Sequence, residues 1–132
     1  MAADDAKQVI AGFWDAMGSN DFEYASKWLA RDYEYYMPQT KEYFTGRANF
    51  VALNQTYPAD GIWLFNVQSI VAEGDISVSD VEITDGSLKV RAVTFHTLID
   101  GLIHRQKEYW PEEYEAPAWR KDFVQIVKSA PF

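Results

Sequence analysis

The chain contains no cysteine, which excludes disulfide bonds, thiolate metal ligands and cysteine nucleophiles. Its only two histidines, His96 and His104, form neither a His-x-His nor a His-Glu-x-x-His pattern. No serine lies in a nucleophile elbow, and the glycines form no phosphate-binding loop. We therefore expect no protein-bound metal.

Basic side chains and long apolar runs are also scarce. Twelve lysines and arginines stand against twenty aspartates and glutamates, which gives a formal charge of −8. This charge repels phosphate backbones and anionic lipids, so we expect neither nucleic acid nor a membrane as a partner. No segment approaches the roughly 18 apolar residues of a membrane helix, and the acidic start, residues 1–5, is unlike a secretion signal. These features predict a cytoplasmic protein.

Aromatic residues, by contrast, are abundant. The chain of 132 residues is 48% apolar and 16% aromatic, with five tryptophans, eight tyrosines and eight phenylalanines. Its length fits a single domain, residues 1–132, with one core. Large aromatic side chains suit a ligand pocket, but core packing and dimer contacts explain them equally well.

The first part of the chain has the period of amphipathic helices. Apolar residues recur at spacings of three and four over residues 4–17, which predicts a first helix. Asn20 or Asp21 is the expected N-cap of a second helix that includes Phe22 to Leu29. Short strands are expected at residues 33–37 and 43–45, and a third helix between Gly46 and Pro58.

From residue 62 to residue 110 the period changes to that of β-strands. Segments rich in β-branched and aromatic residues are separated by Glu73-Gly74-Asp75, Asp85-Gly86 and Asp100-Gly101. Asp-Gly is a favoured two-residue hairpin turn, because both central positions need a positive φ. The pattern predicts an antiparallel meander of strands over residues 62–72, 76–84, 88–99 and 102–110.

This order of elements is typical of the α+β class, in which helices are segregated from most of the sheet. A long antiparallel sheet that curls over helices encloses a cone-shaped cavity, so we expect a pocket there. Residues 111–132 have no regular period but contain Tyr114 and Trp119. Because a solvated tail rarely carries two large aromatics, we expect this segment to pack on the domain or on a partner subunit.

Three segments carry a more specific pattern: residues 13–22, the Gly46-Arg47 pair, and residues 100–103 leading into Glu108-Tyr109-Trp110. Together they resemble the nuclear transport factor 2-like (NTF2-like) superfamily, and within it the SnoaL-like and ketosteroid isomerase-like branch. The similarity covers residues 4 to 120 as an order of elements. It implies a cone-shaped, cystatin-like α+β barrel, a pocket between sheet and helices, no cofactor, and a homodimer. The same fold hosts isomerases, cyclases, hydrolases, dehydratases and binding modules, so the resemblance does not fix the function.

The chain departs from the ketosteroid isomerases at their catalytic positions. In that family a carboxylate stands just before the proline that ends the first strand, and here that position is Met37. The family's second acid falls on Val93 or Thr94, and neither residue can replace it. Steroid isomerisation by that mechanism is therefore not expected.

The limonene epoxide hydrolases place two acids and an arginine across facing strands. The resemblance puts Glu108 and Glu82 at the acids and Asp80 at the arginine, and it puts the acid/base of SnoaL-like cyclases on or beside Glu108. Arg91, on the next strand, is a candidate counter-charge for the acids. Such a set is sufficient for water activation or proton transfer. Alternatively, Asp80, Glu82 and Arg91 pair across strands on a solvated face.

Strand alternation tests Glu108 separately. In residues 102–110, Gln106, Glu108 and Trp110 share the face that matches the family's cavity side, whereas Arg105 and Lys107 suit solvent or a dimer interface. The candidate catalytic residues are Glu108, Glu82, Asp80 and Arg91. The expected ligand-binding residues are Trp14, Trp28, Tyr36, Met37, Phe50, Asn54, Trp63, Gln106 and Trp110, with Phe13 in the same wall, and Tyr35 and Tyr57 are further possible donors to a ligand oxygen.

Two functions fit these observations. The first is a cofactor-independent cyclase, isomerase, hydrolase or dehydratase that acts on a small apolar, oxygen-bearing molecule with Glu108 as acid/base. The second is a non-catalytic module that binds a hydrophobic ligand or dimerises. The absence of an acid at Met37 and of an arginine at Asp80 favours the second function or another chemistry.

Overall fold

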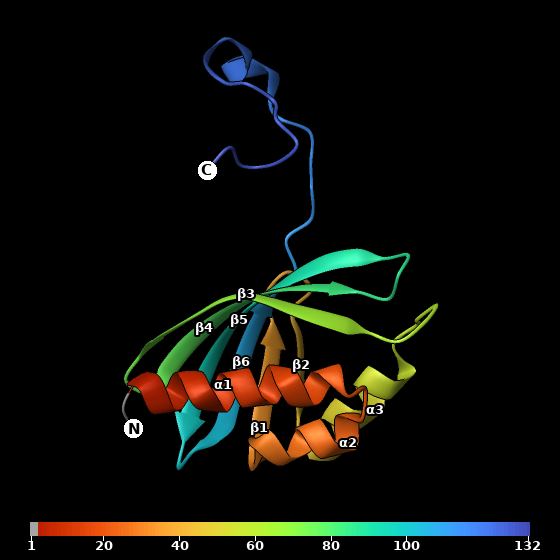
Figure 1. Ribbon diagram of the computed structural model, residues 1–132, viewed down its shortest axis with the longest axis vertical. Coiled ribbons are helices and arrows are strands. Elements are labelled where there is room, and N and C mark those ends of the chain that lie inside the picture. The colour runs from red at the N-terminus through yellow and green to blue at the C-terminus, as the bar shows by residue number, and fades with distance from the viewer. Residues whose placement is uncertain (1–2) are drawn as a thin grey trace.

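Helices lie on one side of a curved sheet in the computed structural model, which describes residues 3–132 (Figure 1). Ile10, Phe13 and Trp14 of the first helix are buried, as its amphipathic period predicts. Asp21 caps the second helix by accepting a hydrogen bond from the backbone N–H of Tyr24. No helix in the described residues is long and apolar enough to cross a membrane. The helices are α1 (Ala3–Gly18), the single turn α2 (Phe22–Ala25), the 3-10 helix η1 (Ser26–Trp28) and α3 (Arg47–Thr56).

The sheet has six strands in the order β2-β1-β6-β5-β4-β3. They are β1 (Leu29–Met37), β2 (Glu42–Thr45), β3 (Leu64–Glu73), β4 (Ile76–Thr84), β5 (Lys89–Ile99) and β6 (Leu102–Tyr109). Strands β3 to β6 form the predicted antiparallel meander. Strand β1 pairs with β6 in parallel, however, so the sheet is mixed rather than wholly antiparallel. A parallel pair needs a long connection, and here the chain through α3 and the meander brings the last strand back beside the first.

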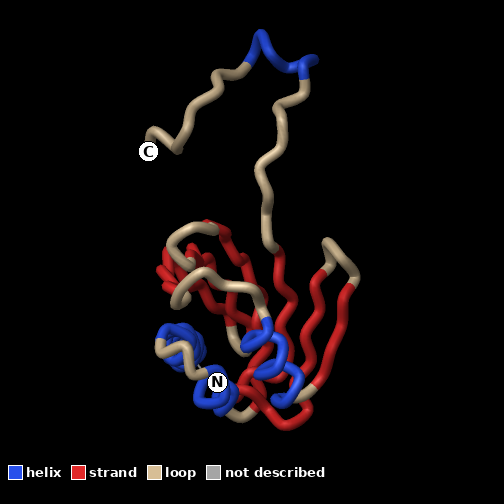
Figure 2. Tube along the Cα trace, turned by 90° about the vertical axis from the view of Figure 1, so that its right-hand side faces the viewer, coloured by secondary structure: helices blue, strands red, loops and turns tan. Residues whose placement is uncertain are grey.

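The sheet is curved but not closed, since β2 and β3 remain as edges. The register shifts between Val67 and Ser69 in β3 and between Thr97 and Leu98 in β5, and such bulges bend strands. Figure 2 shows the curved strands from the side. Helix α1 packs against β3 and β4, on the concave face. The expected cone shape is therefore an open cone, with its interior between the sheet and the helices.

The turns of the meander follow the sequence prediction in part. Asp100 and Gly101 have φ angles of 52° and 77°, as a two-residue turn with two positive φ values requires. Strands β4 and β5 are instead joined by a longer loop, residues 85–88. There Asp85 Oδ1 accepts hydrogen bonds from the backbone N–H groups of Ser87 (3.0 Å) and Leu88 (2.7 Å). The prediction of a two-residue turn at Asp85-Gly86 was wrong because this side chain stabilises a wider loop.

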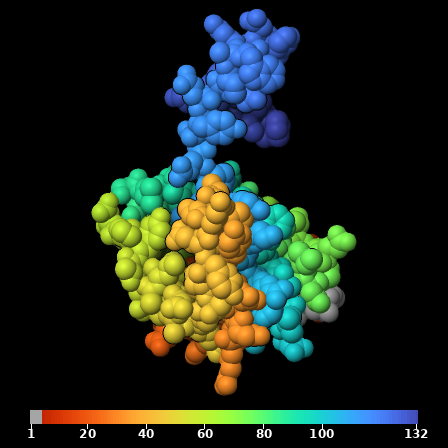
Figure 3. All heavy atoms as spheres, turned by 180° about the vertical axis from the view of Figure 1, so that it is seen from behind, coloured from red at the N-terminus to blue at the C-terminus, as the bar shows by residue number. Residues whose placement is uncertain are grey.

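Residues 111–132, the C-terminal arm, extend away from the sheet and contain the 3-10 helix η2 (Ala118–Phe123) (Figures 1 and 3). Tyr114, Trp119 and Phe123 are 84%, 77% and 83% exposed. These side chains therefore make little contact with the domain itself. Packing on a partner subunit stays a prediction.

Candidate functional site

A cavity of about 690 Å³ lies between the concave face of the sheet and helices α1 and α3. Its charged lining residues are three glutamates, Glu42, Glu108 and Glu112. Aromatic rings form much of the wall: Phe13, Trp14, Phe22, Tyr35, Tyr43, Phe44, Phe50, Tyr57, Trp63, Phe65 and Trp110. The structure therefore contains the aromatic-lined pocket that the sequence predicts.

Glu108 is the buried acidic side chain of this cavity, with 8% exposure. Its Oε1 atom accepts hydrogen bonds from the Tyr35 hydroxyl (2.8 Å) and from Nε1 of Trp110 (2.7 Å). Its Oε2 atom accepts a hydrogen bond from the Thr94 hydroxyl (2.6 Å). All three neighbours donate, which suits an ionised carboxylate because that group only accepts. We name these four residues the Glu108 cluster.

Strand register brings the Glu108 cluster together. Thr94 of β5 lies directly opposite Glu108 of β6, so both side chains point to the same face. Tyr35 of β1 lies opposite Gln106 in the parallel pair. Gln106 is two residues before Glu108 on β6, so the two side chains lie on the same face of the strand. Trp110 follows at the end of β6 on the same side, where its indole N–H reaches back to the carboxylate.

Both tyrosines near the carboxylate are held in their neutral form. Burial, and secondly the charge of Glu108, raise the pKa of Tyr35 well above its ordinary value. The same two causes raise the pKa of Tyr33. Each phenol therefore remains a hydrogen-bond donor over the whole range of physiological pH.

A second buried network lies beside the cluster on the same face. Oε1 of Gln106 accepts a hydrogen bond from the Tyr33 hydroxyl, and its amide nitrogen lies 2.9 Å from Nδ1 of His96. Nε2 of His96 lies 2.7 Å from Oγ of Ser79, which also accepts from Nε1 of Trp14 at 3.0 Å. Burial lowers the pKa of His96 to about 3, so the ring is neutral. The network ties α1 to four strands and supports the floor of the cavity.

Stacked rings stiffen the walls around the carboxylate. Tyr35 stacks on Phe44 with ring centroids 4.8 Å apart, and Tyr57 stacks on Trp110 at 6.0 Å. Trp63 meets Tyr57 edge to face at 5.4 Å. Rings held against one another in this way give a preformed apolar surface for a ligand.

Most of the predicted ligand-binding residues line the cavity, but Trp28 and Tyr36 do not. Trp28 lies outside the cavity, where its ring is close to Gly12 of α1 and edge to face with Tyr24. Tyr36 is 37% exposed and alternates with the inward-facing Tyr35, so it points to the convex face. The predicted residues that do line the cavity are Trp14, Met37, Phe50, Asn54, Trp63, Gln106 and Trp110.

Asp80, Glu82 and Arg91 do not lie in the cavity with Glu108. In β4 the buried face carries Ser77, Ser79, Val81 and Ile83, and the intervening acids therefore point to the convex face. Nε of Arg91 lies 2.7 Å from Asp80 Oδ1, and its NH2 lies 3.9 Å from Glu82 Oε1. Of the two arrangements considered for these residues, the structure has cross-strand pairing on a partly solvated face. The proposed catalytic set is thereby reduced to Glu108.

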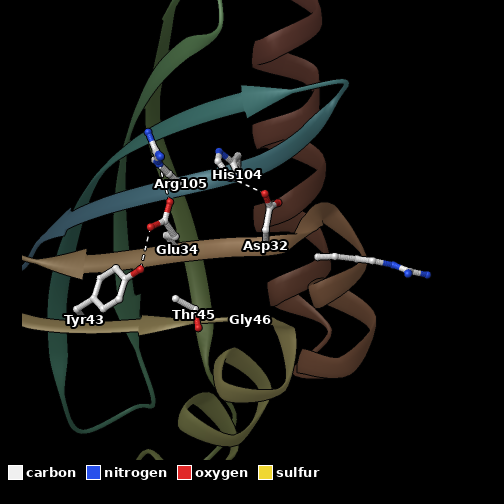
Figure 4. Close-up of a pocket in the computed structure, with 8 residues that line it drawn as sticks. Asp32, Glu34, Tyr43, Thr45, Gly46, His104 and Arg105 are labelled. Carbon is white, nitrogen blue, oxygen red and sulfur yellow. Dashed lines mark hydrogen bonds and ion pairs between the residues drawn. The ribbon is translucent and has the colours of Figure 1, made fainter.

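A second depression, of about 460 Å³, lies on the convex side between β1, β2 and β6 (Figure 4). Its acidic groups have partners within the depression: Glu34 accepts from Tyr43 at 2.8 Å and from Arg105 at 2.7 Å. These two hydrogen bonds, that from Arg105 first, lower the pKa of Glu34. Nε2 of His104 lies 3.1 Å from Asp32 Oδ2. We do not assign a ligand to this depression because both of its acidic side chains, Asp32 and Glu34, already have partners.

Tyr35 and Thr94 are donors to Glu108 whose part in the site the sequence reasoning missed. Tyr35 was one of several tyrosines considered, and Thr94 was considered only as a poor substitute for an acid. Alternation places Thr94 on one face with His96, but only the register between strands shows that it meets Glu108. No group of three or more histidine, aspartate and glutamate side chains among the described residues is arranged to hold a metal ion.

Comparison with known proteins identifies the family. The SnoaL-like domain family matches residues 10–106 of the chain. A Kribbella flavida protein classed with the ketosteroid isomerases is 32% identical in sequence, with a TM-score of 0.88 over 96% of this chain and 93% of that one. Among curated proteins, none matches the chain.

More distant structures share the fold alone. An NTF-2 like protein of unknown function from Burkholderia xenovorans is 24% identical, with a TM-score of 0.77 over 94% of this chain and 96% of that one. An LEH-like epoxide hydrolase from M. tuberculosis is 18% identical, with a TM-score of 0.67 over 83% of this chain and 84% of that one. Neither identity is high enough to carry an activity over to this chain, because one fold hosts many functions.

Proposed function

The chain belongs to the SnoaL-like family, and on this basis we propose that its cavity binds one small, largely apolar molecule with Glu108 as the polar anchor. The observation that carries the proposal is the burial of Glu108 among the aromatic walls of the cavity. A carboxylate in this position accepts a hydrogen bond from a ligand and fixes its orientation, while the rings supply apolar contact.

Proton transfer by Glu108 is the chemistry that we propose for this site. A single carboxylate can take a proton from a bound molecule and return it at another atom, provided that the reacting atoms lie within hydrogen-bond reach. A two-acid mechanism has less support, because Glu82 and Asp80 point away from the cavity. Met37 stands at the position where the ketosteroid isomerases have a catalytic carboxylate. The alternative function is binding without turnover, which uses the same anchor.

The anchor role can be tested with 2-naphthol, a neutral aromatic alcohol, by following tryptophan fluorescence. Glu108→Gln removes the charge but keeps a hydrogen-bond acceptor, and we expect Kd to rise about tenfold because a hydrogen bond to a charged group contributes roughly 1–1.5 kcal/mol more than one to a neutral group. Glu82→Gln is the matched control, since it removes one charge on the convex face and should leave Kd unchanged. Equal affinity of wild type and Glu108→Gln would contradict the anchor role. Native mass spectrometry of the purified protein would show any molecule retained from the cell.

We propose further that the chain forms a homodimer through the convex face and the C-terminal arm. On the convex face, Phe95 and Tyr109 are 44% and 36% exposed, and their rings contact each other with centroids 6.0 Å apart. Trp119 and Phe123 in the arm are more exposed still. A second copy of the chain would cover both of these apolar surfaces in a dimer interface. Light scattering tests this: Phe95→Glu should reduce a dimeric mass to that of one chain, and a monomeric wild type would exclude the dimer.

A further inference from the structure

We propose that the ligand of this cavity carries a positive charge, as a protonated or quaternary amine on an apolar body. The inference rests on the proposed function and names the chemical class of the molecule that the Glu108 cavity takes. It comes from three properties of the cavity: the sign of its charges, the kind of partners that Glu108 has, and the aromatic rings beside the carboxylate.

The charges around the cavity are all of one sign. Glu42, Glu108 and Glu112 line it, and no lysine, arginine or histidine is among the lining residues that the structure describes. Glu42 and Glu112 are exposed at the rim, whereas Glu108 is buried inside. The potential within a low-dielectric cleft follows the charges that line it, so this cavity attracts cations and repels anions.

Glu108 has no positive partner within the described part of the chain. The ion pairs found there join Arg91 to Asp80 and Glu82, Arg105 to Glu34, and His104 to Asp32. The three groups that hold Glu108 are neutral: a phenol, an alcohol and an indole. A buried carboxylate without a counter-charge is costly, and a bound cation supplies the missing charge.

The rings next to Glu108 are the kind that bind cations. Tyr35 and Trp110 both contact the carboxylate directly through hydrogen bonds, and Tyr57 stacks against Trp110. A cation placed over the face of such rings is attracted by their quadrupole, and recognition of quaternary ammonium groups uses aromatic cages of this kind. An ammonium group that pairs with Glu108 would lie inside this aromatic wall. The edges of Tyr35 and Trp110 face the carboxylate, so contact with ring faces would come from the rest of the wall, which also accommodates the body of the ligand.

A pair of isosteric probes separates charge from shape. Phenyltrimethylammonium and tert-butylbenzene have almost the same form but differ in a nitrogen cation and a carbon atom. We expect the full-length protein, followed by tryptophan fluorescence or by NMR, to bind the cation at least about tenfold more tightly than its neutral isostere. Benzenesulfonate, an aromatic anion, should not bind.

Two variants place the effect at Glu108. Glu108→Gln should abolish most of the preference for the cation, whereas Glu82→Gln, which changes the net charge equally on the convex face, should keep it. If the neutral isostere binds as tightly as the cation, the inference of a cationic ligand is wrong and the proposed binding function stands. If neither probe nor 2-naphthol binds, both the inference and the proposed function fail. Preference for the cation that persists in Glu108→Gln also overturns the inference, because the charge that selects it must then lie elsewhere.

Discussion

The two faces of the sheet use the same kinds of side chain in opposite ways. On the convex face, Asp80 and Glu82 surround Arg91, and these side chains keep between 33% and 45% of their surface exposed. On the concave face, Glu108 is 8% exposed and is held by neutral donors alone. An ion pair between a carboxylate and an arginine at the protein surface contributes little to stability. A carboxylate that is buried without a cation, in contrast, remains available to pair with a ligand. The three acids therefore differ in their environment because they lie on different faces of the sheet, and not because of their residue type.

The largest expected effect comes from breaking the buried network of the concave face. Gln106→Leu leaves the Tyr33 hydroxyl and Nδ1 of His96 without partners inside the protein. Because each of these two buried unsatisfied groups costs about 1–3 kcal/mol, we expect the free energy of unfolding to fall by roughly 2–6 kcal/mol. Urea denaturation measures this change.

The neighbouring position gives the matched control for that variant. Lys107 lies next to Gln106 on β6 but points to the convex face, where it is exposed. Lys107→Leu should change the free energy of unfolding by no more than about 0.5 kcal/mol. Similar losses of unfolding free energy in Gln106→Leu and Lys107→Leu would mean that the two faces of the sheet are equally sensitive to substitution.

A smaller effect should appear as a pH dependence that arises on the concave face. Burial lowers the pKa of His96 to about 3, so the unfolded chain binds a proton below pH of about 6.5 while the folded chain does not. The contribution of His96 to stability is therefore present above pH 6.5 and is lost as pH falls toward 3. Between pH 7.5 and 4.5 we expect a loss of roughly 2.5 kcal/mol from this group.

Comparison with a variant that cannot titrate isolates this group. His96→Gln keeps a polar side chain at the position, and its stability should vary less steeply with pH over the same range. Urea denaturation at several pH values measures both slopes. Parallel curves for wild type and His96→Gln would show that His96 is not the group that responds.

Much of this fold was predictable because its signals are local. The periods of three to four and of two residues, together with the glycine turns, are properties of short segments. For the same reason alternation put Glu108 and Gln106 on one face of β6, and the resemblance to the family indicated that this face is the cavity side. The parallel pairing of β1 with β6 and the bulges depend on distant contacts, and no short segment of the sequence encodes them.

The placement of Asp80 and Glu82 shows where alternation fails as a guide. In β4 the inward-facing positions include Ser77 and Ser79, so neither face of the strand reads as clearly apolar. Ser79 can be buried because Trp14 donates to it and His96 contacts it. Those partners come from α1 and β5, and a reading of β4 alone cannot supply them.

The smallest expected effect is the loss of the convex ion pairs. Arg91→Ala removes the contacts with Asp80 and Glu82, which are partly exposed and screened by solvent and salt. We expect the free energy of unfolding to change by no more than about 1 kcal/mol, and by less in high salt. The affinity of the cavity for 2-naphthol should stay at the wild-type value, because the side chain of Arg91 lies across the sheet from Glu108. A marked loss of binding in Arg91→Ala would instead show that Arg91 contributes to ligand binding. It would also show that the convex face influences the cavity on the concave face.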